Sequence, residues 1–109
     1  MKTNPNSLIG KQYDKDTYHC WHFIEEVMHV PLLQDVHVDH ANDDVEKHIG
    51  KFEELDAAEN NCIVLIGKSH IGIWYNGGIY HNDVGGVRYE THRVMRMKYP
   101  GFRYFKVKQ

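Results

Sequence analysis

The sequence predicts an α+β domain in which N-terminal helices pack on a small antiparallel β-sheet. The first observation is an apolar stripe at helical spacing over residues 20–29. The second is a change of periodicity at Cys62, after which short β-branched runs replace the helical spacing. The third is Asn76-Gly77, the preferred residue pair of a two-residue hairpin turn.

The N-terminal half supplies the predicted helices. The helix over 20–29 is expected to end before Pro31, because the residue that precedes a proline avoids the α region. A second helix is expected over 43–55, where apolar residues recur at helical spacing after a cap at Asn42 or Asp43.

The C-terminal half supplies the predicted sheet. Residues 62–66 form an apolar, β-branched run, which is typical of a buried central strand. Strands over 70–75 and 78–82 flank the hairpin turn. We expect a further strand over 87–89, a short helix over 91–97 and a last strand over 102–107.

Length and composition limit the possible classes of protein. The chain has 109 residues, which suits one domain over residues 1–109. It has no apolar run long enough to span a membrane, and MKTNPNSLIG lacks the apolar core of a signal peptide. Two cysteines do not make a disulfide scaffold. We therefore expect synthesis in the cytoplasm with reduced thiols and no contact with membranes.

Charge is distributed unevenly along the chain. Residues 35–59 carry nine acidic residues and two lysines, whereas residues 88–108 carry seven basic residues and one glutamate. A basic segment with aromatic residues can bind phosphates. It is also typical of a solvated edge strand that positive charge protects from pairing, which is the interpretation we favour over nucleic-acid binding.

Cys20 is a candidate nucleophile because it stands where a loop is expected to become a helix. Unpaired N–H groups and the positive end of the helix dipole stabilise a thiolate at that position. The same N–H groups can hold an oxyanion during acyl transfer. The alternative is a small buried thiol that packs in the core, which is the commonest state of a free cysteine.

A thiolate nucleophile needs a histidine base and a third group that orients the base. Among nine histidines, His70 begins a central strand and His81 lies on the strand paired with it. A two-residue turn pairs Gly72 with His81, which places both histidines and Asp83 on one face. We expect this face to meet the N-terminus of the Cys20 helix. A three-residue turn would instead direct His81 to the far face.

Two other motifs do not support a binding site. His-x-x-His pairs occur at His19 and His22 and at His37 and His40, but zinc needs three or four converging ligands. No metal site is therefore expected. The stretch 67–69 imitates the end of a phosphate-binding loop, but it lacks the earlier glycine and the following helix.

The order of "HCWHF", "CIVLIGKSHIGIWYNGGIYHN" and "GGV" resembles the NlpC-type cysteine peptidases. This papain-like superfamily cleaves peptide bonds in bacterial cell walls, and its short phage-tail branch is the most similar. The matching stretches are 10–13 (Gly-x-x-Tyr), Cys20-Trp21, 70–74 and His81. The chain has His-Cys-Trp-His where many members have Asp-Cys-Ser-Gly, which affects the expected specificity more than the triad.

The resemblance implies a papain-like fold and a set of roles. Cys20 would be the nucleophile, His70 the general base and His81 the group that orients His70. Asp83, opposite His70, is the rival orienting group. Substrate contacts would come from residues near the nucleophile and on the strand of the base: Tyr13, His19, Trp21 and Trp74.

The expected function is therefore a thiol hydrolase that cleaves a peptide or amide bond without a cofactor. The resemblance makes the stem peptide of peptidoglycan the expected substrate, in a phage tail or prophage setting where tail proteins are partners and the protein is associated with the virion. Two alternatives remain open. One is a deamidase or acyl-transfer enzyme that acts on a protein. The other is a tail-assembly or inhibitory binding module without catalytic activity.

Overall fold

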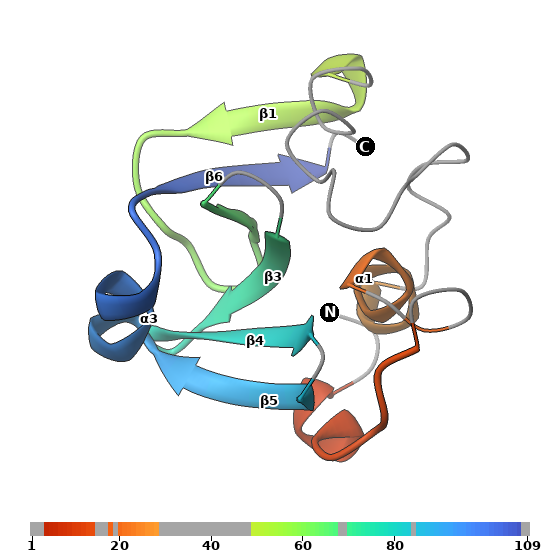
Figure 1. The fold of residues 1–109 in the computed structure, drawn as a ribbon. Coiled ribbons are helices and arrows are strands. Elements are labelled where there is room, and N and C mark those ends of the chain that lie inside the picture. The colour runs from red at the N-terminus through yellow and green to blue at the C-terminus, as the bar shows by residue number, and fades with distance from the viewer. Residues whose placement is uncertain are drawn as a thin grey trace.

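The computed structural model describes residues 4–14, 18, 20–28, 49–67, 70–83 and 85–107 (Figure 1). Its helical elements are η1 (Pro5–Leu8), α1 (Cys20–Met28), η2 (Ile49–Lys51) and α3 (His92–Lys98). Its strands are β1 (Phe52–Leu55), β2 (Ile63–Ile66), β3 (His70–Tyr75), β4 (Gly78–Asp83), β5 (Gly86–Thr91) and β6 (Phe102–Val107).

The described chain is mainly one antiparallel sheet of six strands, in the order β1-β6-β2-β3-β4-β5. The described residues contain only two short α-helices, α1 and α3. The predicted class, an α+β domain with N-terminal helices packed on a small sheet, is therefore wrong. The molecule is a small β-rich domain.

The main cause of this correction is the segment predicted as the second helix. Residues 43–48 of it lie outside the described part of the chain, and Ile49–Lys51 is a short 3₁₀ turn. Phe52–Leu55 is strand β1, which pairs with β6 across about fifty residues of sequence. Helical spacing of apolar residues is a local signal, and pairing with a distant strand overrides it.

The predictions for the strands are largely confirmed. Strand β2 is buried along its whole length, as expected of a central strand. Asn76 and Gly77 both have positive φ angles, 48° and 78°, which a type I′ turn requires. The turn sets the expected register, in which Gly72 pairs with His81. The short helix predicted over 91–97 is α3, one residue later.

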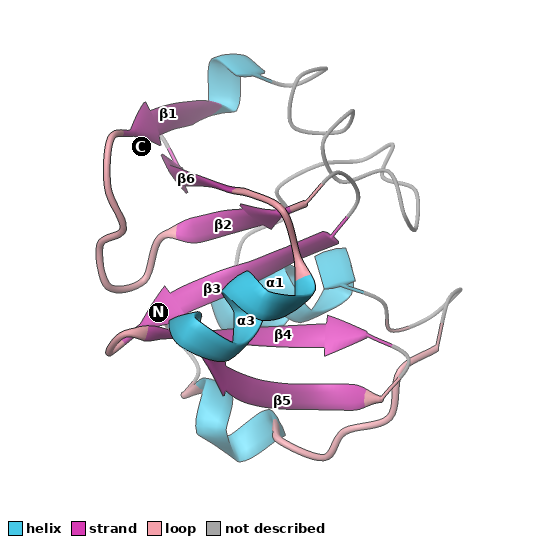
Figure 2. Cartoon of the chain, turned by 60° about the vertical axis from the view of Figure 1, so that its left-hand side comes forward, coloured by secondary structure: helices cyan, strands magenta, loops and turns pink. Residues whose placement is uncertain are grey.

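The sheet separates two apolar clusters. On one face, α1 packs against β3 and β4 and forms a cluster that includes Cys20, Trp21 and Phe105. On the other face, Met95 of α3 packs on Val64 and neighbouring side chains. Figure 2 shows the two helices on opposite sides of the sheet. We call these the α1 face and the α3 face.

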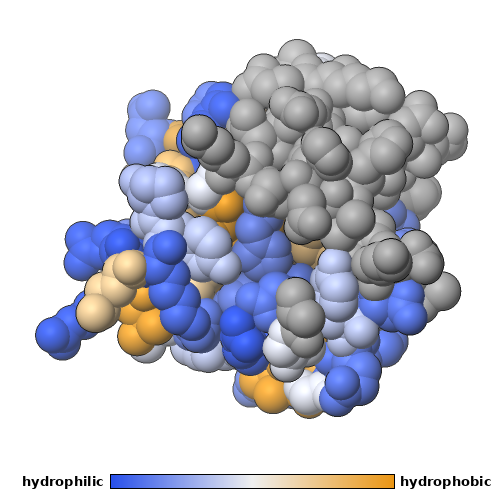
Figure 3. All heavy atoms as spheres, in the orientation of Figure 1, coloured by the Kyte–Doolittle hydropathy of each residue, from blue (hydrophilic) through white to orange (hydrophobic). Residues whose placement is uncertain are grey.

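The coloured part of the surface in Figure 3 is mostly hydrophilic, and one group of apolar atoms lies over α3. Val94 and Met97 of this helix are exposed, and Met97 is 83% exposed. Among the described helices, none is both long and apolar enough to cross a membrane.

Candidate functional site

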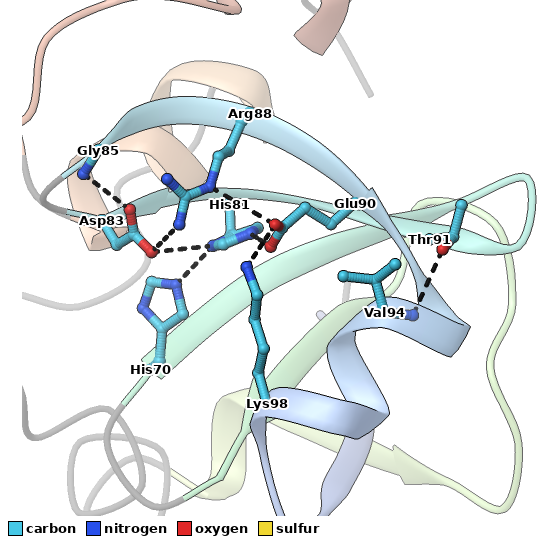
Figure 4. A network of polar contacts seen from close by, with 9 residues as sticks. All are labelled: His70, His81, Asp83, Gly85, Arg88, Glu90, Thr91, Val94 and Lys98. Atoms are coloured by element: carbon cyan, nitrogen blue, oxygen red, sulfur yellow. Dashed lines mark hydrogen bonds and ion pairs between the residues drawn. The ribbon is translucent and has the colours of Figure 1, made fainter.

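His70 and His81 meet on the α3 face of the sheet. His70 begins β3, and His81 lies on the neighbouring strand β4. His70 Nε2 is 2.9 Å from His81 Nδ1, and Figure 4 shows the two rings pointing toward each other. The prediction that both histidines share one face is therefore confirmed.

Gly72 makes this meeting possible because it lies opposite His81. A Cβ atom at Gly72 would stand 2.6 Å from the Tyr80 carbonyl oxygen and 3.2 Å from the His81 Cβ. Glycine thus lets β4 approach β3 closely and leaves room for the His81 ring to lean toward His70.

Glu90 of β5 holds the other side of the His81 ring. His81 Nε2 is 2.9 Å from Glu90 Oε2, and Lys98 of α3 donates to the second carboxylate oxygen. Sequence reasoning missed Glu90, which it counted only as an acid within a basic segment. On β5 it lies two residues beyond Arg88, the register partner of His81, and therefore on the same face.

The contacts of Glu90 determine the direction of the hydrogen bonds that link His70, His81 and Glu90, which we call the proton chain. A carboxylate only accepts hydrogen bonds, so His81 Nε2 carries the hydrogen. In a neutral ring Nδ1 of His81 is then the acceptor, and His70 Nε2 must donate to it. The proton on His70 therefore lies on Nε2, and its Nδ1 keeps a free lone pair.

Asp83 lies next to the histidine pair, as the predicted register requires, but its described hydrogen bonds go to residues other than His70. Its Oδ2 accepts a hydrogen bond from Arg88 Nη2 at 2.7 Å and lies 3.8 Å from His81 Nδ1. Its Oδ1 accepts from the Gly85 backbone N–H. The described hydrogen bond that orients His70 is therefore the one that its Nε2–H donates to His81 Nδ1. Asp83 lies beside the pair.

Burial keeps both histidines neutral at pH 7. It is the main cause that lowers the pKa of His70 to about 4, with the His81 charge as the next cause. Burial also lowers the pKa of His81, although the hydrogen bond to Glu90 opposes it. Burial opposes ionisation of Glu90, but hydrogen bonds from Lys98 and His81 outweigh it and lower its pKa.

The end of α3 covers this site. Tyr99, directly after the helix, stacks on the His70 ring with centroids 6.2 Å apart. Half-buried Trp74, a predicted substrate contact, lies on the same face in edge contact with His92 and Tyr104. The aromatic side chains support the α3 side of the sheet next to the histidines.

Cys20 belongs to the other face of the sheet. It opens α1 as predicted, but it is only 4% exposed and packs in the α1-face cluster. The expectation that the histidine face meets this helix is wrong. Side chains alternate along β3, so Ile71 and Ile73 point toward α1 while His70 points toward α3.

Of the remaining predicted substrate contacts, Trp21 belongs to the α1 face and so lies away from the histidine pair. Trp21 is fully buried in the α1-face cluster, so its ring is part of the core and not of an open cleft. Tyr13 is half-buried beside the bridge between Asp14 and Tyr18. His19 lies outside the described residues.

Comparison with known proteins identifies no relative. No protein-family model matches the chain, and neither does any curated protein or any solved structure. The site must therefore be interpreted from its own geometry, with the resemblance in sequence beside it.

Proposed function

We propose that the protein is a thiol hydrolase in which Cys20 is the nucleophile and His70 is the general base. The observation that carries the proposal is the directed chain from Glu90 through His81 to His70. A nucleophilic cysteine needs a base whose ring is fixed by a third group, and this chain supplies both.

The direction of the chain assigns one atom to the chemistry. Nε2 of His70 is bonded to His81, so only Nδ1 is left to accept a proton from a thiol. Cys20 would attack the carbonyl carbon, and His70 would return the proton to the leaving amine. Water, with its proton taken by His70, would then hydrolyse the acyl-enzyme and regenerate the thiol.

The position of Cys20 sets the main requirement of the proposal. Cys20 is the first residue of α1, where helix N–H groups favour a thiolate and can hold an oxyanion. The sulfur and the His70 ring belong to opposite faces of the sheet. Catalysis therefore requires Cys20 to reach Nδ1 past the start of β3.

The proposed substrate is the stem peptide of bacterial peptidoglycan, in a phage tail or prophage setting. This part of the proposal rests on the sequence resemblance alone. Digestion of purified sacculi, with the fragments analysed by mass, tests the substrate. Cys20→Ala should abolish cleavage, and Cys62→Ser, which changes a core thiol, should leave the chemistry intact.

A binding module without catalytic activity is the second candidate. It is favoured by the burial of Cys20 in the α1-face cluster. It is also favoured by the surface of α3, on which Arg93, Arg96 and Lys98 are exposed together with Met97.

Thiol reactivity separates the two candidates. A hydrolase should show fast alkylation of Cys20 by iodoacetamide at pH 7, whereas Cys62 should react slowly because burial raises its pKa. Peptide mapping after a brief exposure measures both rates. Two equally slow thiols would contradict the hydrolase and support the binding module.

A further inference from the structure

The histidine pair, together with Asp83, also offers atoms that could bind a metal ion. His70 Nε2, His81 Nδ1 and the Asp83 carboxylate each present one donor atom, and these three atoms lie within 4.8 Å of one another. We propose that this cluster binds a zinc ion, and that the ion disables His70 as a base.

The donor set fits zinc in kind and in spacing. Two imidazole nitrogens and one carboxylate leave the fourth tetrahedral position open. Zinc–nitrogen bonds of about 2.0–2.1 Å place two ligand atoms about 3.3 Å apart. The histidine nitrogens are 2.9 Å apart, and His81 Nδ1 and Asp83 Oδ2 are 3.8 Å apart. These two contacts need shifts of about half an ångström, and the third pair, His70 and Asp83, whose donor atoms lie within 4.8 Å of each other, must also close to about 3.3 Å.

Glu90 and Arg88 prepare these ligands. Glu90 accepts a hydrogen bond from Nε2 of His81, and so keeps the Nδ1 lone pair directed into the cluster. A carboxylate behind a metal-binding histidine is a common supporting contact that strengthens metal binding. Arg88 holds the Asp83 carboxylate at the edge of the cluster, as Figure 4 shows.

Zinc would change the tautomer of His70. The hydrogen on Nε2 occupies the position that the ion needs, so a neutral ring must carry its proton on Nδ1 instead. Nδ1 then carries the ring hydrogen and can no longer accept a proton. This inhibition rests on the proposed function, whereas the binding of zinc does not.

Calorimetric titration of the metal-free full-length chain with zinc chloride at pH 7 tests the site. We expect one ion per chain and a change in the ring resonances of His70 and His81. Cobalt should give the intense visible absorption of a tetrahedral site. Glu90→Gln should weaken binding by about 10–100-fold, and Asp83→Asn by at least a similar factor.

Two control variants and one further ligand variant make the result interpretable. Asp56→Asn changes an exposed carboxylate outside the cluster and should leave binding unchanged. The double change His37→Asn with His40→Asn removes one of the two His-x-x-His pairs and should also leave binding unchanged. His70→Asn provides a second ligand variant if Asp83→Asn fails to fold through loss of its contact with Arg88.

The outcomes separate binding from inhibition. Absence of zinc binding, unchanged binding in both ligand variants, or loss that follows only the His37 and His40 change would each overturn the site. Full hydrolysis of a confirmed substrate at saturating zinc would leave the site standing and would exclude His70 as the base.

Discussion

At the scale of single residues, Glu90 carries more of the site than its position in the sequence indicated. It accepts a hydrogen bond from the Nε2–H of the buried His81 ring and is itself held by Lys98. His81 is completely buried, and Glu90 is the described acceptor for its Nε2–H.

Glu90→Ala should therefore lower the free energy of unfolding by about 1–3 kcal/mol, the cost of a buried donor without a partner. Glu90→Gln should recover much of the loss because the amide oxygen can accept the same hydrogen bond. Urea denaturation measures both. Glu53→Ala, which removes an exposed ion pair with Lys106, is the control and should cost less than about 1 kcal/mol. Equal effects at the two positions would show that Glu90 is not a buried partner.

The lowered pKa of His70 predicts how stability depends on pH. Its pKa is about 4 in the folded protein and about 6.5 in the unfolded chain, so between these values the unfolded state binds more protons. Stability should rise from pH 4 to 6.5, by at most about 1.4 kcal/mol per pH unit from this group, and then level off. The titratable and charged groups that face the ring are His81, Asp83, Arg88, Glu90 and Tyr99.

Denaturant unfolding across this pH range measures the effect. His70→Asn, which cannot titrate, should flatten part of the slope. A wild-type stability that increases as the pH falls from 6.5 to 4 would contradict the buried neutral histidine.

At the scale of elements, the β3–β4 hairpin places the histidines. Gly72→Ala should force the strands apart, because the new Cβ would stand 2.6 Å from the Tyr80 carbonyl oxygen and 2.7 Å from Ile79 Cγ2. We expect a loss of about 1–3 kcal/mol in stability and a displaced His81 ring. Gly101→Ala is the matched control, since no atom lies within 4 Å of its Cβ position. Equal stability of the two variants would show that β3 and β4 are not as close as described.

The hairpin also shows which features a sequence can predict. Asn76-Gly77 fixes its own turn, and the turn fixes the register that joins His70 to His81, so this part followed from local chemistry. Strand β1 did not, because Phe52–Leu55 becomes a strand only through pairing with β6. Glu90 was missed for a similar reason, since the predicted strand over 87–89 ended before it.

At the scale of the whole molecule, sequence reasoning could not predict which face of the sheet each helix covers. The helix that begins at Cys20 was correctly expected to pack on the core, but the core has two faces. Alternation along β3 places His70 with α3 and the α1 contacts on the other side. Which face a helix covers depends on the path of the connecting chain, and no local pattern determines it.

The central claim is that Glu90 directs a proton chain that leaves Nδ1 of His70 free. Nitrogen-15 NMR of the histidine rings at pH 7 tests this directly, because protonated and unprotonated ring nitrogens resonate at different positions. The account predicts that His70 and His81 are both neutral and both carry their hydrogen on Nε2. A hydrogen on Nδ1 of either ring, or a charged His70, would contradict it.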